Sequence, residues 1–114
     1  MEACLFCNIV AARIPATRVY DDADTLAFAD IRPQAPTHLI VIPKSHIPRV
    51  VDVAESQERT MGHLIGVANE LARRHGLAES GFRLVINCGP SGGQTVYHLH
   101  VHLLGGRAMH WPPG

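Results

Sequence analysis

The chain has 114 residues, which is enough for one domain with a single hydrophobic core and too few for two. Ten basic and ten acidic residues cancel, so a surface for binding a nucleic acid polymer is not indicated. No apolar run has the length of a membrane span, and we expect neither a signal peptide nor a membrane partner. Three cysteines are a poor disulfide framework, and we therefore expect a cytoplasmic protein.

Cys4 and Cys7 form a Cys-x-x-Cys pair near the start of the chain. No predicted strand precedes the pair, which argues against a thioredoxin-like redox site. Two interpretations stay open: half of a tetrahedral zinc site, or two small buried apolar residues. Residues 5–12 have the pattern of a short helix, which Ile14-Pro15 ends.

Residues 17–20 and 25–29 alternate well enough to predict a hairpin around an aspartate-rich turn. Asp30 and Ile31 follow the second strand directly. A carboxylate at a strand end can accept both hydroxyls of a ribose, and an isoleucine can pack on a flat base. The alternative is that Asp30 is an ordinary turn residue.

Residues 38–43 form an apolar run that predicts a central strand covered on both faces. His38, at its start, is either a satisfied core histidine or a member of an imidazole cluster. Lys44, at its end, has the pattern of a solvated surface charge.

From about residue 55 to residue 75, apolar side chains recur every three or four positions. This period predicts a long amphipathic helix, with Gly76 as a left-handed cap. His63 lies off the apolar stripe, and we expect it to face solvent or a subunit interface.

Residues 82–87 are predicted to form the next strand, which delivers Asn87 to a glycine-rich segment, residues 88–97. Glycines leave backbone N–H groups free to line a concave anion site. Taken alone, the segment fits a plain turn equally well, and it is not a Walker loop because no Gly-Lys-Ser/Thr is present. Next to Thr95 and the histidines that follow, it favours a phosphate cradle.

His98, His100 and His102 alternate with large apolar residues over residues 98–104. Alternation predicts a strand with the three imidazoles on one face, rooted roughly 6–7 Å apart. Three uses fit this pattern: buried histidines satisfied by neighbours, a metal centre, or catalysis by a neutral imidazole acting as nucleophile or base.

The run His98-x-His100-x-His102-Leu103-Leu104 resembles the histidine-triad motif of the HIT superfamily of nucleotidyl hydrolases and transferases. Residues 92–97 before it and 105–114 after it are similar to the Hint branch, and the resemblance runs from about Cys4 to the last residue. It implies one α+β domain over residues 1–114, with a HIT-like fold of about five mainly antiparallel strands, one long helix and one short helix.

The resemblance also implies a hydrolase that cleaves purine nucleoside 5′-phosphoramidates, such as AMP-NH2 and AMP-lysine, through a nucleotidyl-histidine intermediate. His100 is the implied nucleophile and His102 binds phosphoryl oxygens, with His98 and His38 completing the imidazole set. Thr95, which stands where the best-known Hint proteins have serine, binds the leaving amine or a phosphate oxygen. The implied nucleotide contacts are Phe28, Asp30, Ile31, Ile40, Asn87, Gly93, Gln94, Thr95, His100 and His102. Ala29 departs from the histidine of some Hint proteins.

Resemblance to the zinc-bearing members implies that His46 and His98 join Cys4 and Cys7 around a structural zinc ion that catalysis does not need. It further implies that the tail, residues 105–114, contributes to a homodimer and to the rim of the site. A dinucleoside polyphosphate hydrolase, a nucleotidyltransferase and a non-enzymatic nucleotide-binding module remain alternatives.

Overall fold

The structure is a computed structural model that describes residues 3–114. A five-stranded sheet with the order β1-β2-β3-β5-β4 forms its middle layer, and every neighbouring pair is antiparallel. The strands are β1 (Arg18–Asp21), β2 (Thr25–Ala29), β3 (Thr37–Pro43), β4 (Phe82–Val85) and β5 (Val101–Gly105). The predicted α+β class and the central place of the 38–43 strand are confirmed.

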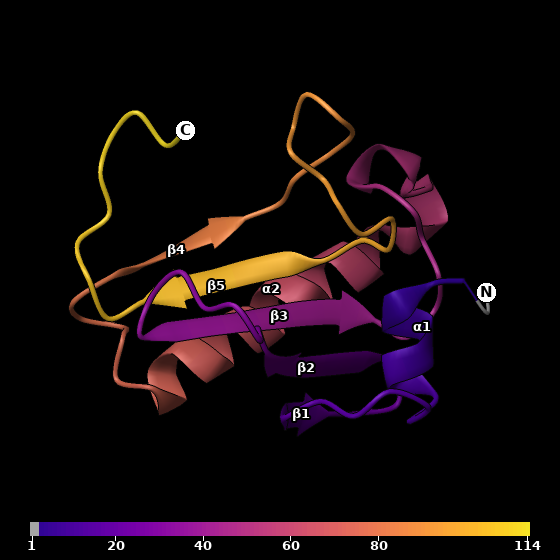
Figure 1. Ribbon diagram of the computed structural model, residues 1–114, viewed down its shortest axis with the longest axis horizontal. Coiled ribbons are helices and arrows are strands. Elements are labelled where there is room, and N and C mark those ends of the chain that lie inside the picture. The colour runs from indigo at the N-terminus through magenta and orange to yellow at the C-terminus, as the bar shows by residue number, and fades with distance from the viewer. Residues whose placement is uncertain (1–2) are drawn as a thin grey trace.

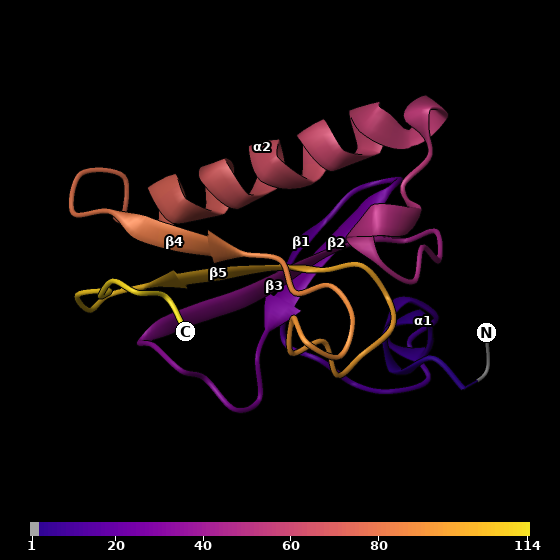
Figure 2. The same cartoon turned by 90° about the horizontal axis from the view of Figure 1, so that it is seen from above.

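Two helices cover opposite faces of the sheet (Figures 1 and 2). The long helix α2 (Glu58–Arg74) follows two short 3₁₀ turns, η1 (Val50–Asp52) and η2 (Glu55–Gln57). Its buried side chains are Leu64, Val67, Ala68, Leu71 and Ala72. This spacing places one apolar stripe on the sheet, as the sequence predicts.

The short helix α1 (Leu5–Val10) lies on the other face. Phe6 and Ile9 are its buried residues, and they pack against Leu26, Phe28, Ile40 and Ile42 from β2 and β3. The sheet therefore has two separate cores, and the even-numbered residues of β3 face α1. The histidines of the triad lie on this α1 side.

The end of α2 follows the predicted capping pattern. Gly76 has φ +70°, a conformation in which a side chain is strained, and Leu77 folds back so that its N–H donates to the Ala72 carbonyl at 2.9 Å.

Two strand predictions are wrong at their ends. The strand expected over residues 98–104 begins only at Val101, because β5 pairs with β3 only as far as Val41. The N–H of Leu99 instead donates to the Ile47 carbonyl, in the segment after β3. The strand expected over residues 82–87 ends at Val85, so Asn87 already lies in the loop.

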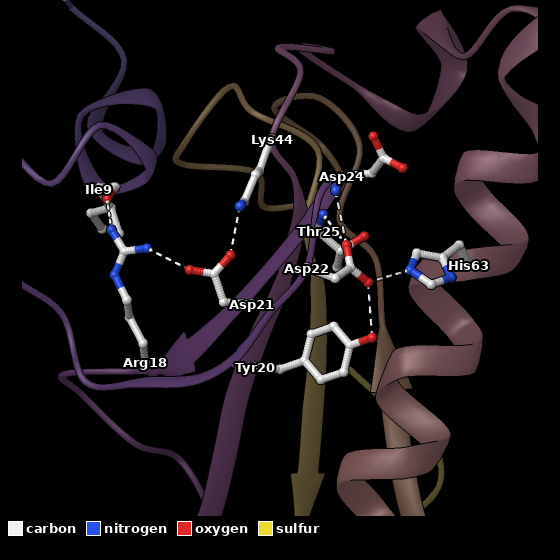
Figure 3. A network of polar contacts seen from close by, with 9 residues as sticks. All are labelled: Ile9, Arg18, Tyr20, Asp21, Asp22, Asp24, Thr25, Lys44 and His63. Carbon is white, nitrogen blue, oxygen red and sulfur yellow. Dashed lines mark hydrogen bonds and ion pairs between the residues drawn. The ribbon is translucent and has the colours of Figure 1, made fainter.

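His63 and Lys44, both predicted to face solvent, are exposed and partly exposed respectively, and each also has a carboxylate partner that the sequence does not predict (Figure 3). His63 Nε2 lies 2.7 Å from Asp22 Oδ2, which ties α2 to the β1–β2 turn. Lys44 Nζ lies 2.5 Å from Asp21 Oδ1. Each aspartate is more than 20 residues from its partner along the chain, so no local sequence pattern predicts either contact. Within residues 3–114, the structure has no helix long and apolar enough to cross a membrane.

Candidate active site

Four histidines come from neighbouring strands to the α1 face of the sheet. His102 lies in β5 opposite Ile40, and His38 lies in β3 opposite Leu104, which makes the two histidines diagonal neighbours on one face. His100 precedes β5, and its ring centroid lies 4.9 Å from that of His102. The single face predicted from alternation is thus confirmed, although two of the three triad histidines precede the strand itself.

The proton on His100 is fixed by the backbone. Its Nδ1 lies 2.7 Å from the carbonyl oxygen of His98. A carbonyl only accepts, so Nδ1 carries the hydrogen and Nε2 keeps its lone pair. His100 therefore presents an unprotonated nitrogen away from the chain that holds it, which is the state a nucleophile or base requires.

Two successive hydrogen bonds, from Gln34 to His38 and from His38 to His102, fix the hydrogen of His102 on the other ring nitrogen, Nε2. The Gln34 N–H donates to His38 Nδ1 at 3.0 Å, so the hydrogen of the neutral His38 ring is on Nε2. That Nε2–H donates to His102 Nδ1 at 2.8 Å. His102 must then carry its own hydrogen on Nε2. The adjacent rings of His100 and His102 consequently present an acceptor and a donor.

Burial keeps these rings neutral. It lowers the pKa of His100, with partial compensation from the His98 carbonyl and from Asp30. Burial also lowers the pKa of His38, against the opposing effect of Asp30. For His102, burial and the neighbouring rings of His100 and His38 lower the pKa to about 4. Neutral imidazoles at pH 7 are what the tautomer assignment needs.

Asp30 lies at the edge of this cluster, just after β2. Its Oδ2 is 3.4 Å from His38 Nε2, and its Oδ1 accepts the Arg32 N–H at 2.8 Å. Asp30, His38 and His102 are close enough to surround a cation. However, His38 Nε2 and His102 Nδ1 are already joined by a hydrogen bond. The Gln34 N–H bonded to His38 Nδ1 keeps the shared hydrogen on His38 Nε2. The set is a hydrogen-bonded relay and fits a metal poorly.

The glycine-rich loop is held by two amide side chains. Asn87 Nδ2 donates to the Gly92 carbonyl at 2.7 Å. Gln94 is buried, accepts the Gly89 N–H at 2.9 Å and donates to the carbonyls of Pro48 and Val96. Gln94 therefore shapes the loop through its side chain, and its nucleotide contact stays a prediction. Thr95 is exposed.

An apolar cavity of about 210 Å³ lies between α1 and the end of β2. Four of the predicted nucleotide contacts, Phe28, Asp30, Ile31 and Ile40, line this one cavity. Ile31 is 91% exposed and lies free at the edge of the cavity. Most of the remaining wall comes from α1 and the segment after it, including Leu5, Ile9, Ile14, Pro15 and Ala16, and Val96 of the glycine-rich segment also contributes.

The remaining triad histidine, His98, belongs to a different cluster. Its Nε2–H donates to the Pro43 carbonyl at 2.8 Å, which leaves Nδ1 as a lone pair. That Nδ1 lies 3.4 Å from Cys4 Sγ, 3.5 Å from Cys7 Sγ and 3.3 Å from His46 Nδ1. The His98 ring thus faces the cysteines, and its link to His100 runs through its carbonyl oxygen.

These distances match the edges of a zinc tetrahedron. With Zn–N of about 2.0 Å and Zn–S of about 2.3 Å, two nitrogens lie about 3.3 Å apart and a nitrogen and a sulfur about 3.5 Å apart. The Cys7 Sγ to His46 Nδ1 distance of 3.3 Å also fits, and all four ligand atoms lie within 4.8 Å of one another. Burial and the adjacent Cys4 raise the pKa of the Cys7 thiol to about 11.

Two site residues have no signal in the sequence. Phe6 places its ring edge-on to His100, with centroids 5.1 Å apart, and closes the imidazole cluster from α1. Gln34 acts through its backbone N–H, which any residue other than proline could supply. Such contacts depend on long-range packing and leave no local pattern.

Comparison with known proteins agrees with this geometry. The HIT domain profile matches residues 11–109, and the chain belongs to the HIT domain family. It is 47% identical over 108 residues to the purine nucleoside phosphoramidase of Escherichia coli K12, covering 95% of this chain and 91% of that protein. It is 52% identical over 113 residues to a 14 kDa zinc-binding protein of Zea mays, covering 96% and 87%.

A solved structure of a HIT family hydrolase from Legionella pneumophila Philadelphia 1 superimposes with a TM-score of 0.96 at 54% identity. The match covers 97% of this chain and 99% of that one. The predicted family and its HIT fold are therefore confirmed, and the family is one of hydrolases.

Proposed function

We propose that this protein hydrolyses purine nucleoside 5′-phosphoramidates, with His100 as nucleophile. The observation that carries the proposal is the proton arrangement of the cluster, which gives His100 Nε2 a lone pair beside the Nε2–H of His102. The 47% identity to a purine nucleoside phosphoramidase supports the choice of the P–N bond.

In the proposed first step, His100 Nε2 attacks the α-phosphorus and forms a P–N bond to the imidazole. The bond from phosphorus to the amine breaks, and the amine leaves with a proton from solvent, hydrogen-bonded to the Thr95 hydroxyl. The positive charge that develops on the His100 ring is stabilised by the His98 carbonyl at its Nδ1–H. His102 Nε2–H and the glycine loop bind the phosphoryl oxygens.

In the second step, water attacks phosphorus and breaks its bond to His100, which releases the nucleoside monophosphate and restores the free imidazole. Asp30 accepts the ribose hydroxyls, and the base enters the apolar cavity between Phe28, Ile31 and Ile40. The Asn87 amide and the Gly93 backbone hold the loop in its phosphate-binding shape.

We further propose that Cys4, Cys7, His46 and His98 hold a zinc ion. The fit of four ligand atoms to tetrahedral distances supports this, together with the similarity to a zinc-binding protein of Zea mays. With four protein ligands the ion is closed to substrate, and it supplies a structural cross-link between α1 and the triad segment.

A homodimer is the third part of the proposal. β4 is an edge strand, and its backbone is open to a second copy. The tail is joined to β4 by Arg83, whose Nη2 donates to the His110 carbonyl at 2.7 Å, and Trp111 in the tail is 84% exposed. Sedimentation equilibrium at micromolar concentration is expected to give the mass of two chains.

The direct test is AMP release from adenosine 5′-phosphoramidate by the wild type and by His100→Ala. The wild type is expected to release AMP, and the variant is expected to lose at least about a thousandfold in kcat. An equal rate for the two would reject His100 as the nucleophile. AMP binding without any release from AMP-NH2 or AMP-lysine would favour the non-enzymatic nucleotide-binding module.

A further inference from the structure

The two cysteines of α1 are accessible to small solutes. Cys4 and Cys7 are both half-buried, and Cys4 and His46 line a cavity of about 420 Å³ that the mechanism above does not use. Leu5 and Tyr97 line the same cavity and are 43% and 42% exposed. The cavity therefore gives a small solute access to the Cys4 side chain while α1 stays folded.

The two sulfurs are also placed to react with each other. Cys4 is the N-cap of α1, and its Sγ accepts the Cys7 N–H at 3.3 Å, so the Cys4 side chain lies over the first turn of the helix. The two Sγ atoms are within 4.8 Å of each other. Rotation of the two side chains can bring them to the S–S bond length of about 2.05 Å.

The same sulfurs join α1 to the rest of the molecule. In the proposed zinc site they share one ion with His46, which follows β3, and with His98, which precedes β5. A disulfide would instead join Cys4 only to Cys7, within α1 itself, and would leave no thiolate to bind zinc. Oxidation would thus replace a tertiary cross-link by a local one.

The end of α1 that this cross-link holds forms a wall of the nucleoside pocket. Leu5 and Phe6 line that cavity, and the Phe6 ring lies edge-on to Phe28 with centroids 5.3 Å apart. A helix of six residues is not stable without tertiary contacts. Its other end keeps a separate contact, because Arg18 Nη2 donates to the Ile9 carbonyl at 2.6 Å. Loss of the zinc cross-link therefore acts on the pocket wall at Leu5 and Phe6.

We infer that Cys4 and Cys7 form a thiol redox switch, in which oxidation by a hydroperoxide makes a disulfide, releases the zinc ion and weakens nucleotide binding. The inference rests on the zinc site and the nucleoside pocket of the proposed function, and it adds a regulation of that site. It differs from a thioredoxin-like exchange site, because the oxidation acts on a metal cross-link and no substrate disulfide is involved.

The oxidation has two steps that balance with hydrogen peroxide as the oxidant. In the first, the Cys4 sulfur attacks one peroxide oxygen, the O–O bond breaks, and Cys4 becomes a sulfenic acid as one water leaves. In the second, the Cys7 sulfur attacks the Cys4 sulfur, the S–O bond breaks, and a second water leaves as the S–S bond forms. The two thiolates lose two electrons, solvent supplies two protons, and the peroxide is reduced to two waters.

The test treats zinc-loaded wild-type protein with hydrogen peroxide and then removes the oxidant. A chromogenic chelator is expected to detect about one zinc ion released per chain. Peptide mass spectrometry should find Cys4 and Cys7 in one peptide that has lost two hydrogen atoms. The Kd for AMP, measured by titration calorimetry, is expected to rise roughly five- to 20-fold. Dithiothreitol followed by zinc should restore the original Kd.

Two controls separate the cysteine pair from other effects of peroxide. Cys88→Ser removes the third cysteine, which lies outside the cluster, and is expected to respond like the wild type. Cys7→Ser is expected to have the raised Kd before treatment and to show no further change with peroxide. Wild type stripped of zinc by a chelator under reducing conditions should reach the same raised Kd, which tests the cross-link without any substitution.

Zinc that stays bound after peroxide treatment would overturn the switch. So would oxidation of either cysteine to a sulfinic acid in place of the disulfide, because dithiothreitol does not reverse it. Zinc release with an unchanged Kd for AMP would overturn the coupling to the pocket. A wild type that holds no zinc after refolding with it would overturn the zinc site and the switch together. A wild type that shows all three responses but hydrolyses no phosphoramidate would support the switch and overturn the phosphoramidase function alone.

Discussion

His38 controls the chemistry of the cluster without being its nucleophile. Its Nδ1 accepts the Gln34 N–H, and its Nε2–H fixes the hydrogen of His102 on the nitrogen that faces the proposed phosphate site. An isolated neutral imidazole exchanges between two tautomers, so this relay removes one unproductive state.

Replacing His38 therefore tests the relay. His38→Ala is expected to lower kcat/KM for AMP-NH2 about 10- to 100-fold, the usual effect of losing a group that orients an active-site histidine. Nitrogen NMR of His102 is expected to show the hydrogen distributed over both ring nitrogens. The control is His63→Ala, a histidine on α2 at the opposite face of the sheet. Unchanged tautomers in His38→Ala would contradict the relay.

The sequence predicts the residues of this cluster better than their hydrogen bonds. Alternation places the three histidines on one face, and the apolar run that begins at His38 predicts a neighbouring strand. The place of His98 beside Cys4 and Cys7 follows only from the family resemblance, because alternation alone does not reveal the hydrogen bond to the Pro43 carbonyl that orients its ring. Phe6 and Gln34 contribute through packing and backbone position, which residue identity does not encode.

The glycine loop acts as an element with a fixed shape. A Cβ on Gly92 would overlap the carbonyl oxygen of Cys88 and lie 2.8 Å from its backbone nitrogen. The loop must move to accept any side chain there, since both obstructing atoms belong to the backbone.

Gly92→Ala is accordingly expected to lower kcat/KM about 10- to 100-fold, because the displaced N–H groups no longer match the phosphoryl oxygens. The matched control is Gly66→Ala, on the exposed side of α2, where a Cβ has nothing within 4 Å. That control is expected to keep its activity and gain roughly 0.5–1 kcal/mol of stability. Steady-state kinetics measures kcat/KM of the two variants, and urea unfolding measures their stability. Full activity of Gly92→Ala would show that the loop shape is dispensable.

The β1–β2 turn is tied to α2 by the carboxylate of Asp22. Burial opposes its ionisation, but hydrogen bonds from His63, from the N–H groups of Asp24 and Thr25, and from the Tyr20 hydroxyl outweigh burial (Figure 3). The pKa of Asp22 is therefore held well below its ordinary value of 3.8.

A lowered pKa in the folded state means that the ionised carboxylate stabilises the fold at every pH above 3.8 and loses this effect as pH falls further. Asp22→Asn is expected to cost about 2 kcal/mol at pH 7. The difference from the wild type should narrow below about pH 4. Chemical unfolding across pH measures it, with Asp24→Asn as control because that carboxylate points away from the network (Figure 3). A pH-independent difference would show that the effect is not electrostatic.

At the scale of the elements, the sheet and the long helix follow from hydrophobic period alone. The strand ends do not, because a strand stops where its partner stops, as β5 does at Val101. The carboxylate partners of His63 and Lys44 are not predicted from the sequence, because the two aspartates belong to another element.

The two parts of the proposed site meet in one segment of the molecule. The His98 ring belongs to the Cys/His cluster, and its carbonyl holds the His100 hydrogen. A zinc ion bound there would stabilise both α1 and the segment that carries the nucleophile.

Cys7→Ser tests this arrangement. The wild type is expected to contain about one zinc ion per chain, and the variant much less. Loss of roughly 2 kcal/mol of stability should lower Tm by about 10 °C. Cys88→Ser is the matched control, because that cysteine lies outside the cluster. Atomic absorption and thermal unfolding give the two readouts. Protein refolded with zinc that still contains none would contradict the assignment.

Covalent chemistry at His100 is the central claim, and trapping the intermediate tests it most directly. Wild-type protein mixed with adenosine 5′-phosphoramidate and quenched in alkali, where a phosphorus–imidazole bond survives, is expected to gain the mass of one adenylyl group. Fragmentation should place that group on His100, and His100→Ala should gain no mass. Turnover without any adduct, or an adduct on His98 or His102, would contradict the account.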